Sequence, residues 1–245
     1  MHRVSRFQSF LTMVALTLLA TVPAVAGGPI LIEDHFSYAD GSLVSASAWE
    51  NHSGTMGDLL VASGQAVVQH GAPSEDAHLD YADAAGTVYL GFAFSIDDLG
   101  APYSGTDNEY FIHFREEGTF NFVARVDVVE PSGAGDFTLG IATSGGTADA
   151  TWASDLTFGT TYKVIVAYDQ VADQAELWID PADEMSTSIL GADLADPGVT
   201  ANSVALRQSD SSENETIRID DIVVGTDFDA VLALVPVELQ SFSIE

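Results

Sequence analysis

The sequence predicts an all-β fold in which two antiparallel sheets pack face to face as a jelly-roll β-sandwich. Alternation of apolar and polar residues recurs in short segments, and turns rich in Gly, Asp, Asn, Ser and Pro separate these segments. No segment carries apolar residues at helical spacing over three turns. The chain has 245 residues, 47% of them hydrophobic, and no cysteine, so its own core must hold it together without disulfides.

Residues 1–26 have the pattern of a secretory signal peptide. Arg3 and Arg6 form a basic start, residues 10–22 are apolar, and Ala24-Val25-Ala26 is a cleavage motif. The apolar run is too short to span a bilayer comfortably, and no later stretch qualifies, so we expect no membrane insertion. We therefore expect an exported protein, either secreted or held at the cell surface.

Acidic residues dominate the rest of the chain. Removing residues 1–26 leaves five basic residues against 37 acidic ones, so the net charge is 5 − 37 = −32. A surface of this charge repels phosphate groups, so we expect no nucleic-acid partner. The charge suits divalent cations or a cationic partner, although solubility alone also explains it.

The predicted strands follow one another at short spacing. They cover residues 30–38, 58–62, 65–70, 87–97, 109–115, 119–130, 136–143, 161–169, 174–180, 203–208 and 215–225. We expect tight turns between the second and third of these strands and at residues 170–173. One domain is thus predicted over residues 29–228, and residues 229–245 are predicted to be a linker or truncated tail.

The last predicted strand carries an aspartate on each face. Strict alternation places Asp221 on one face with Ile217 and Ile219, and Asp220 on the other face. A carboxylate on an apolar face costs several kcal/mol unless it is paired, hydrogen-bonded or bound to a cation. Asp34, in the first predicted strand, is likewise a carboxylate on an apolar face.

Several segments resemble the concanavalin A-like, laminin G-like sandwich domains of secreted bacterial proteins. These segments are residues 34–43, 110–114, 124–126, 161–166, 176–181, 205–208 and 219–225. The resemblance covers most of residues 30–228 and implies a noncatalytic module for glycans or adhesion. Residues 235–245 resemble the segment that precedes the sorting domain of type IX secretion cargo, but that domain is not found in this sequence.

The resemblance also implies that the first and last strands lie close together. Asp34 would then approach Asp220 or Asp221, with Asp40 nearby. Oxygen ligands of this kind suit Ca²⁺, so a structural calcium site is one hypothesis. In the alternative, Arg218 and backbone amides satisfy these acids.

A ligand face is predicted from basic, polar and aromatic residues in the strands. His113, Arg125, Arg207 and Gln208 could contact sugar hydroxyls or a uronate carboxylate, and Trp178 could stack on a sugar ring. The alternative is structural, because cations in so acidic a chain are expected to pair with carboxylates and tryptophan is often part of the core.

Catalysis is the weaker expectation. Glu176 and Asp180 share a strand face, as do the paired acids of sandwich glycosidases, but Trp178 occupies the position of the middle acid. We therefore expect a noncatalytic module that binds a polysaccharide or cell-surface glycan. The alternatives are a polysaccharide hydrolase or lyase that uses His113 or Glu176, and a structural matrix protein without a small ligand.

Overall fold

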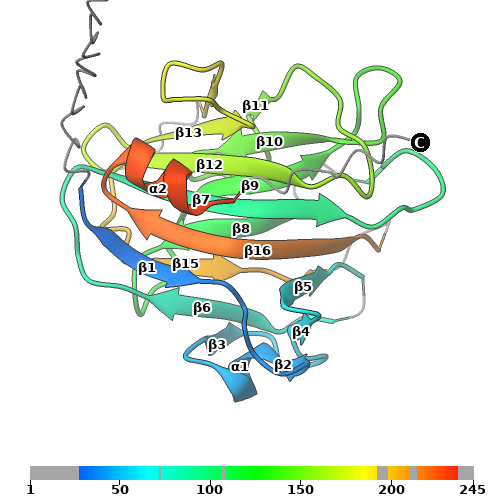
Figure 1. Cartoon of the computed structure of the whole chain (residues 1–245), viewed down its shortest axis with the longest axis horizontal. Helices are drawn as coiled ribbons and strands as arrows, with labels where there is room; N and C mark the ends of the chain where they lie inside the picture. The colour runs from blue at the N-terminus through cyan, green and yellow to red at the C-terminus, as the bar shows by residue number, and fades with distance from the viewer. Residues whose placement is uncertain (1–27, 72, 106–108, 192–197, 210–213, 237–245) are drawn as a thin grey trace, which may run out of the picture.

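Two antiparallel sheets packed face to face make up the fold in the computed structural model (Figure 1). The structure describes residues 28–71, 73–105, 109–191, 198–209 and 214–236. This architecture confirms the predicted two-sheet sandwich. Within the described residues, no helix is long and apolar enough to cross a membrane.

The first sheet has nine strands. Eight follow the order β14 (Ile189–Leu190), β13 (Gln174–Ile179), β12 (Tyr162–Asp169), β7 (Thr87–Ile96), β16 (Thr216–Gly225), β5 (Gln65–Gln69), β4 (Leu60–Ala62) and β2 (Gly41–Ser42). The ninth, β1 (Ile30–Asp34), pairs with the second half of β16 on the edge that β5 uses in the first half. The first and last strands are therefore neighbours, as the resemblance implied. A single helical turn, α1 (Leu43–Ala46), follows β2.

The second sheet has seven strands. Their order is β11 (Ala150–Thr151), β10 (Thr138–Ala142), β9 (Phe122–Val129), β8 (Glu109–Arg115), β15 (Ser203–Leu206), β6 (Asp76–Asp80) and β3 (Glu50–Ser53). The central strands β8, β15 and β6 are in register, so that His113, Ala205 and His78 form one row across the sheet.

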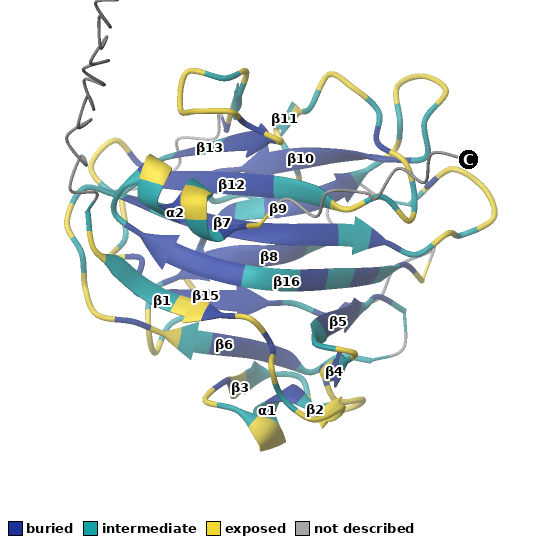
Figure 2. Ribbon diagram, viewed as in Figure 1, coloured by how far each residue is buried: buried dark blue, intermediate teal, exposed yellow. Residues whose placement is uncertain are grey.

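The main core fills the space between the two sheets. Phe92 and Phe94 from β7 meet Phe111 from β8 and Phe137, with ring centroids 5.8 to 6.2 Å apart. Figure 2 shows the buried residues concentrated in the long strands and the exposed ones in the loops. Because apolar side chains alternate along these strands, the polar side chains between them face outward.

A helix covers the outer face of the nine-stranded sheet, where a linker was predicted. This helix, α2 (Phe228–Leu234), lies in front of β12, β7 and β16 in Figure 1. Asp227 caps it by accepting a hydrogen bond from Ala230 N at 2.9 Å, and its own residues Phe228 and Val231 are buried against the sheet. Residues 229–234, the start of the segment predicted to be a linker or truncated tail, belong to this helix; residues 237–245 lie outside the described part of the chain.

A β-bulge in β16 corrects the predicted faces of the last strand. Its register on β7 shifts between Asp220 and Val223, and Asp221 adopts a left-handed φ of 52°. The bulge keeps Ile219 and Ile222 on the same core face and leaves both aspartates half-buried on the opposite side. Neither aspartate therefore interrupts the core, in contrast to the prediction from strict alternation.

Strands β3 and β6 are among those that were not predicted from the sequence. β6 has the alternating pattern of a strand, with Ala77 and Leu79 between polar residues, so its signal was present. β3 reads Glu-Asn-His-Ser and has no apolar alternation. Its position is fixed by pairing with β6, a long-range contact that local pattern cannot show.

Candidate functional site

The outer face of the seven-stranded sheet, turned away from the viewer in Figure 1, gathers cationic and aromatic side chains. We call it the arginine–histidine face. It consists of Tyr110, His113 and Arg115 from β8, Phe122 and Arg125 from β9, Arg207 next to β15, His78 from β6 and His52 from β3. Neighbouring members of this set contact one another, so they form one continuous surface.

Tyr110 lies at one end of this face beneath two arginines. The guanidinium carbon of Arg207 is 4.1 Å from the centre of the Tyr110 ring, and that of Arg125 is 4.8 Å from it. Arg207 also donates a hydrogen bond to the Tyr110 carbonyl oxygen at 3.2 Å. Within the described residues, no carboxylate lies within ion-pair distance of Arg207. The Tyr110 ring thus orients the remaining N–H donors of Arg207, and no carboxylate of the described residues pairs with them.

An irregularity in β9 puts Arg125 on this face. The register between β8 and β9 shifts around His113, and Ala124 has a left-handed φ of 52° while its N–H donates to Thr143 O at 2.7 Å. Val123 and Val126 therefore both point into the core, and Arg125 between them points out.

His113 lies at the centre of the face but beneath its surface. It is fully buried, with its ring 4.4 Å from that of Phe122 and 5.5 Å from that of Tyr110. Its Nδ1 is 3.0 Å from the Phe114 carbonyl oxygen, whereas Nε2 has no hydrogen-bond partner within the described residues. Burial lowers the pKa of His113 well below its ordinary value, so the imidazole is neutral at neutral pH.

A groove with a volume of about 330 Å³ opens beside His113, toward the edge strand β3. His52, His78 and Arg115 line its base, and the loop after β8 contributes Glu117 and Phe120 to its wall. Burial is the main cause that lowers the pKa of His52 to about 3 and also lowers the pKa values of His78 and Arg115. None of the groove residues named here was singled out from the sequence, because the strands that bring the two histidines together were not recognised.

Gln208 supports the face rather than extending it. It is buried; its side-chain oxygen accepts from Gln69 N at 3.2 Å, and its side-chain nitrogen donates to the carbonyl oxygens of Gly57 and Glu75, both at 3.1 Å. All three groups are protein backbone, so this side chain positions the segment that carries Arg207.

Trp178 and Glu176 lie far from this face, on the outer side of the other sheet. Trp178 is buried under α2, with its ring 5.1 Å from that of Phe228. Glu176 accepts a hydrogen bond from Ser188 Oγ at 2.5 Å, and Asp180 accepts one from Lys163 N at 2.8 Å. The structure thus brings together His113, Arg125 and Arg207 but not Trp178.

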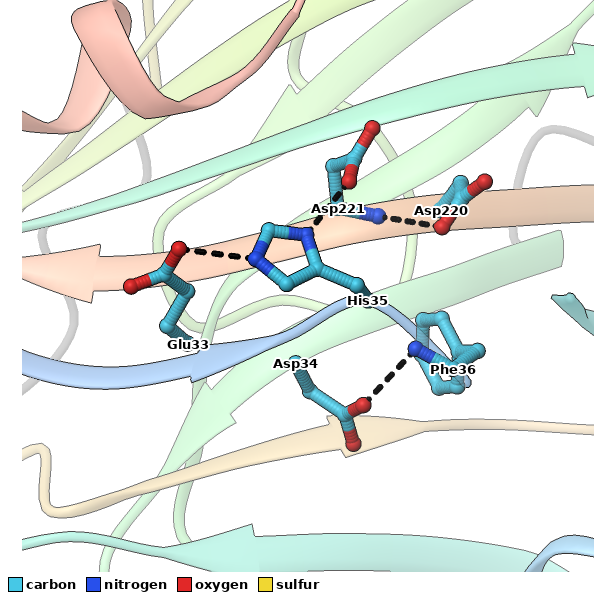
Figure 3. Close-up of polar contacts among 6 residues, drawn as sticks. All are labelled: Glu33, Asp34, His35, Phe36, Asp220 and Asp221. Atoms are coloured by element: carbon cyan, nitrogen blue, oxygen red, sulfur yellow. Dashed lines mark hydrogen bonds and ion pairs between the residues drawn. The ribbon is translucent and has the colours of Figure 1, made fainter. Parts of the chain in front are cut away.

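The four aspartates of the predicted calcium site have separate partners. Asp34 points into the core, where it accepts hydrogen bonds from Phe36 N at 2.8 Å, Tyr38 Oη at 3.1 Å and Trp49 Nε1 at 2.6 Å. Asp40 accepts from Ser63 N. Asp220 accepts from Asp221 N, and the Asp221 carboxylate contacts His35, as Figure 3 shows.

The described residues include no group of three or more His, Cys, Asp or Glu side chains placed to hold a metal ion. Calcium binding by these aspartates stays a prediction, with the expected result that calcium raises the melting temperature of the purified protein and EDTA lowers it. A calcium titration without any shift would contradict it.

His35 instead joins the first and last strands. Its Nδ1 lies 2.6 Å from an Asp221 carboxylate oxygen and its Nε2 lies 2.7 Å from a Glu33 carboxylate oxygen (Figure 3). The hydrogen bond with Asp221, followed by that with Glu33, raises the pKa of His35 above its ordinary value.

Comparison with known proteins gives no family assignment. No family model matches the chain, and no curated protein matches it. Among solved structures, an alginate lyase matches with a TM-score of 0.54 and 14% identity over 82% of this chain and 98% of the lyase. The Lotus tetragonolobus seed lectin matches with a TM-score of 0.47 and 12% identity over 79% of this chain and 96% of the lectin. Peanut lectin matches with a TM-score of 0.46 and 13% identity over 80% of this chain and 97% of the lectin.

Identities this low establish only a shared fold. Of these three matches, the alginate lyase alone has a TM-score above 0.5, so the comparison of folds rests on it. The chain is thus similar to this lyase in the arrangement of its sheets, and its chemistry has to be argued from its own residues.

Proposed function

We propose that this protein is an exported, noncatalytic module whose arginine–histidine face binds an acidic polysaccharide. The observation that carries the proposal is the distribution of charge. The whole chain has a formal net charge of −30 and only seven lysines and arginines. Three of the five that follow residue 26, namely Arg115, Arg125 and Arg207, lie on this one face.

The chemistry of the face suits a sugar that carries a carboxylate. Guanidinium groups form bidentate hydrogen bonds with carboxylates, and the Tyr110 ring holds Arg125 and Arg207 in place for that geometry. The acidic remainder of the surface would repel the same polymer, which would restrict binding to this face. The alginate lyase that shares the fold acts, as its name states, on alginate.

Binding without cleavage is favoured by the burial of His113. A general base must come within hydrogen-bond distance of the proton that it removes. His113 is 0% exposed, and its ring packs 4.4 Å from that of Phe122. A lyase is the second candidate, because the neutral imidazole of His113 lies beside Tyr110 and two arginines. The arginines could neutralise the carboxylate of a uronate, and the imidazole could then remove the proton from the neighbouring carbon.

Replacing both Arg125 and Arg207 with alanine is expected to weaken binding to alginate or polygalacturonate by at least about 100-fold, since each charge-assisted contact contributes about 1.5–3 kcal/mol and two are lost. Isothermal titration calorimetry of wild type and variant measures the change, and rising salt should weaken wild-type binding. Arg218→Ala is the matched control, because Arg218 lies on the other sheet and is paired with Asp97 at 2.7 Å.

An unchanged affinity in the double variant, or equal losses in the double variant and the control, would contradict the proposal. Release of unsaturated uronate products, abolished by His113→Ala, would replace it with the lyase.

A further inference from the structure

The groove beside His113 has a different chemistry from the surface around Tyr110. Glu50, Asp80 and Glu117 line it together with one arginine and two histidines whose lowered pKa values keep them neutral. A carboxylate ligand would meet three carboxylates there and only one fixed cation. The groove therefore does not suit a second acidic group.

Several buried polar atoms around the groove lack partners within the described residues. These atoms are both ring nitrogens of His52, Nδ1 of His78, Nε and Nη1 of Arg115, and Oγ of Ser203. Buried polar groups are normally hydrogen-bonded, and leaving them unpaired costs free energy. Their concentration at one groove indicates a site that is completed by a polar ligand.

The groove offers hydrogen-bond acceptors and donors side by side, which is the arrangement that hydroxyl groups need. A sugar hydroxyl can donate to a carboxylate and accept from a guanidinium or an imidazole N–H at the same time. Phe120 stands at the wall with 72% of its surface exposed, and its ring is 5.9 Å from that of Phe122. An exposed aromatic ring beside such polar groups provides a flat apolar surface for a sugar ring.

The groove lies close enough to Arg125 and Arg207 for both to bind the same polysaccharide chain. His113 links them, because its ring lies 5.5 Å from Tyr110 on one side and 6.2 Å from His52 on the other. We propose that the groove is a subsite for an uncharged sugar, so that the protein prefers polysaccharides in which uncharged sugars separate the acidic ones. This inference rests on the proposed function and adds the class of polymer that the site selects.

Binding to two groups of polymers tests the preference. Hyaluronan and gellan contain uncharged sugars between their uronates, whereas alginate and polygalacturonate consist of uronates. Wild-type protein is expected to bind at least one mixed polymer about tenfold more tightly than either uronate polymer. Phe120→Ala is expected to remove this advantage, with about a tenfold loss for the mixed polymer and no change for the uronate polymers.

A second variant and a control distinguish a loss of binding from a loss of folding. His52→Gln should give the same selective loss as Phe120→Ala, while Val171→Ala, which truncates another exposed apolar residue outside the groove, should leave all affinities unchanged. Circular dichroism and melting curves show whether each variant is folded.

The outcomes separate the two proposals. If wild type prefers no mixed polymer, or if Phe120→Ala and His52→Gln leave its preference intact, the neutral-sugar subsite is wrong while binding at the arginines stands. If both variants weaken all polymers equally, the groove contributes to the site without selecting a neutral sugar, and the subsite is again wrong. If wild type binds none of the four polymers, the proposed function fails, and the subsite fails with it.

Discussion

Replacing Asp34 with alanine is expected to lower the free energy of unfolding by about 4 kcal/mol, because three donors then lose their acceptor in the core. Trp49 Nε1, Tyr38 Oη and Phe36 N all donate to this one carboxylate. Trp49 is 1% exposed, so water cannot replace the lost bond without disturbing the packing. For a domain of this size, the corresponding fall in melting temperature is about 10 °C.

Asp34 also holds a strained part of the backbone. Phe36 has a φ of 46°, a left-handed conformation that is unfavourable for an aromatic residue, and it is fully buried. The bond from Phe36 N to Asp34 fixes this turn at the end of β1. Loss of the carboxylate therefore removes both a buried acceptor and the group that fixes the turn.

Two further variants make the Asp34 prediction specific. Asp40→Ala is the control, since Asp40 is exposed and accepts a single hydrogen bond from Ser63 N, so its loss should cost no more than about 1 kcal/mol. Asp34→Asn keeps an acceptor oxygen and should recover part of the stability. Equal unfolding free energies for Asp34→Ala and Asp40→Ala, measured by urea denaturation, would show that Asp34 does not have this role.

Acidification is expected to destabilise the protein through its buried histidines. The pKa of His52 is about 3 in the folded state, mainly because of burial and then because of Arg115 and His78, against about 6.5 when unfolded. Above pH 6.5 the ring is neutral in both states and costs nothing. As the pH falls from 6.5 toward 3, only the unfolded state takes up the proton, so stability is lost progressively.

The expected loss from His52 is up to about 1 kcal/mol for each pH unit below 6.5, allowing for its partial exposure. The pKa values of His113 and His78 are also lowered, so both add losses of the same sign. Urea denaturation of wild type and His52→Gln between pH 7.5 and 4.5 gives the unfolding free energy of both proteins at each pH. Titration of the acidic surface affects both proteins equally, so it cancels in the difference between them. The wild-type curve should fall more steeply than that of the variant.

His35→Gln provides a control of opposite sign. Hydrogen bonds with Asp221 and Glu33 raise the pKa of His35, so its contribution is fully present below pH 6.5 and is lost as the pH rises through the raised value. The variant should therefore be less stable than wild type at acid pH and match it at alkaline pH. Parallel curves for wild type and His52→Gln would exclude a role for His52 in the acid response.

The fold was predictable because its strongest signals are local. The hairpin of β4 and β5 and the long strands β7 and β12 follow directly from alternation and turn residues. The bulge at Asp220 was not predictable, since nothing in the alternation marks where a strand gains a residue. Helix α2 was missed because seven residues are too few to show helical periodicity without the sheet on which they pack.

The site was predictable only in part, for the same reason. His113, Arg125 and Arg207 lie in segments that were predicted as strands, and they were selected there as basic and polar residues. Trp178 satisfies the same local criteria but lies in the other sheet, under a helix that was not expected. His52 and Arg115 become neighbours only through the order of β3, β6, β15 and β8, which is a property of the whole fold.

Helix α2 has a practical consequence for how the protein can be attached to a surface. Gly28 packs against Thr226, just before this helix, and Pro236, just after it, lies beside Ala93 and Asp220, so both residues lie on the nine-stranded side. The arginine–histidine face is on the opposite side. A biotin or a short tag joined next to Gly28 or Pro236 would therefore leave that face open to solution, and immobilised protein should bind polysaccharide with the affinity that it has when free.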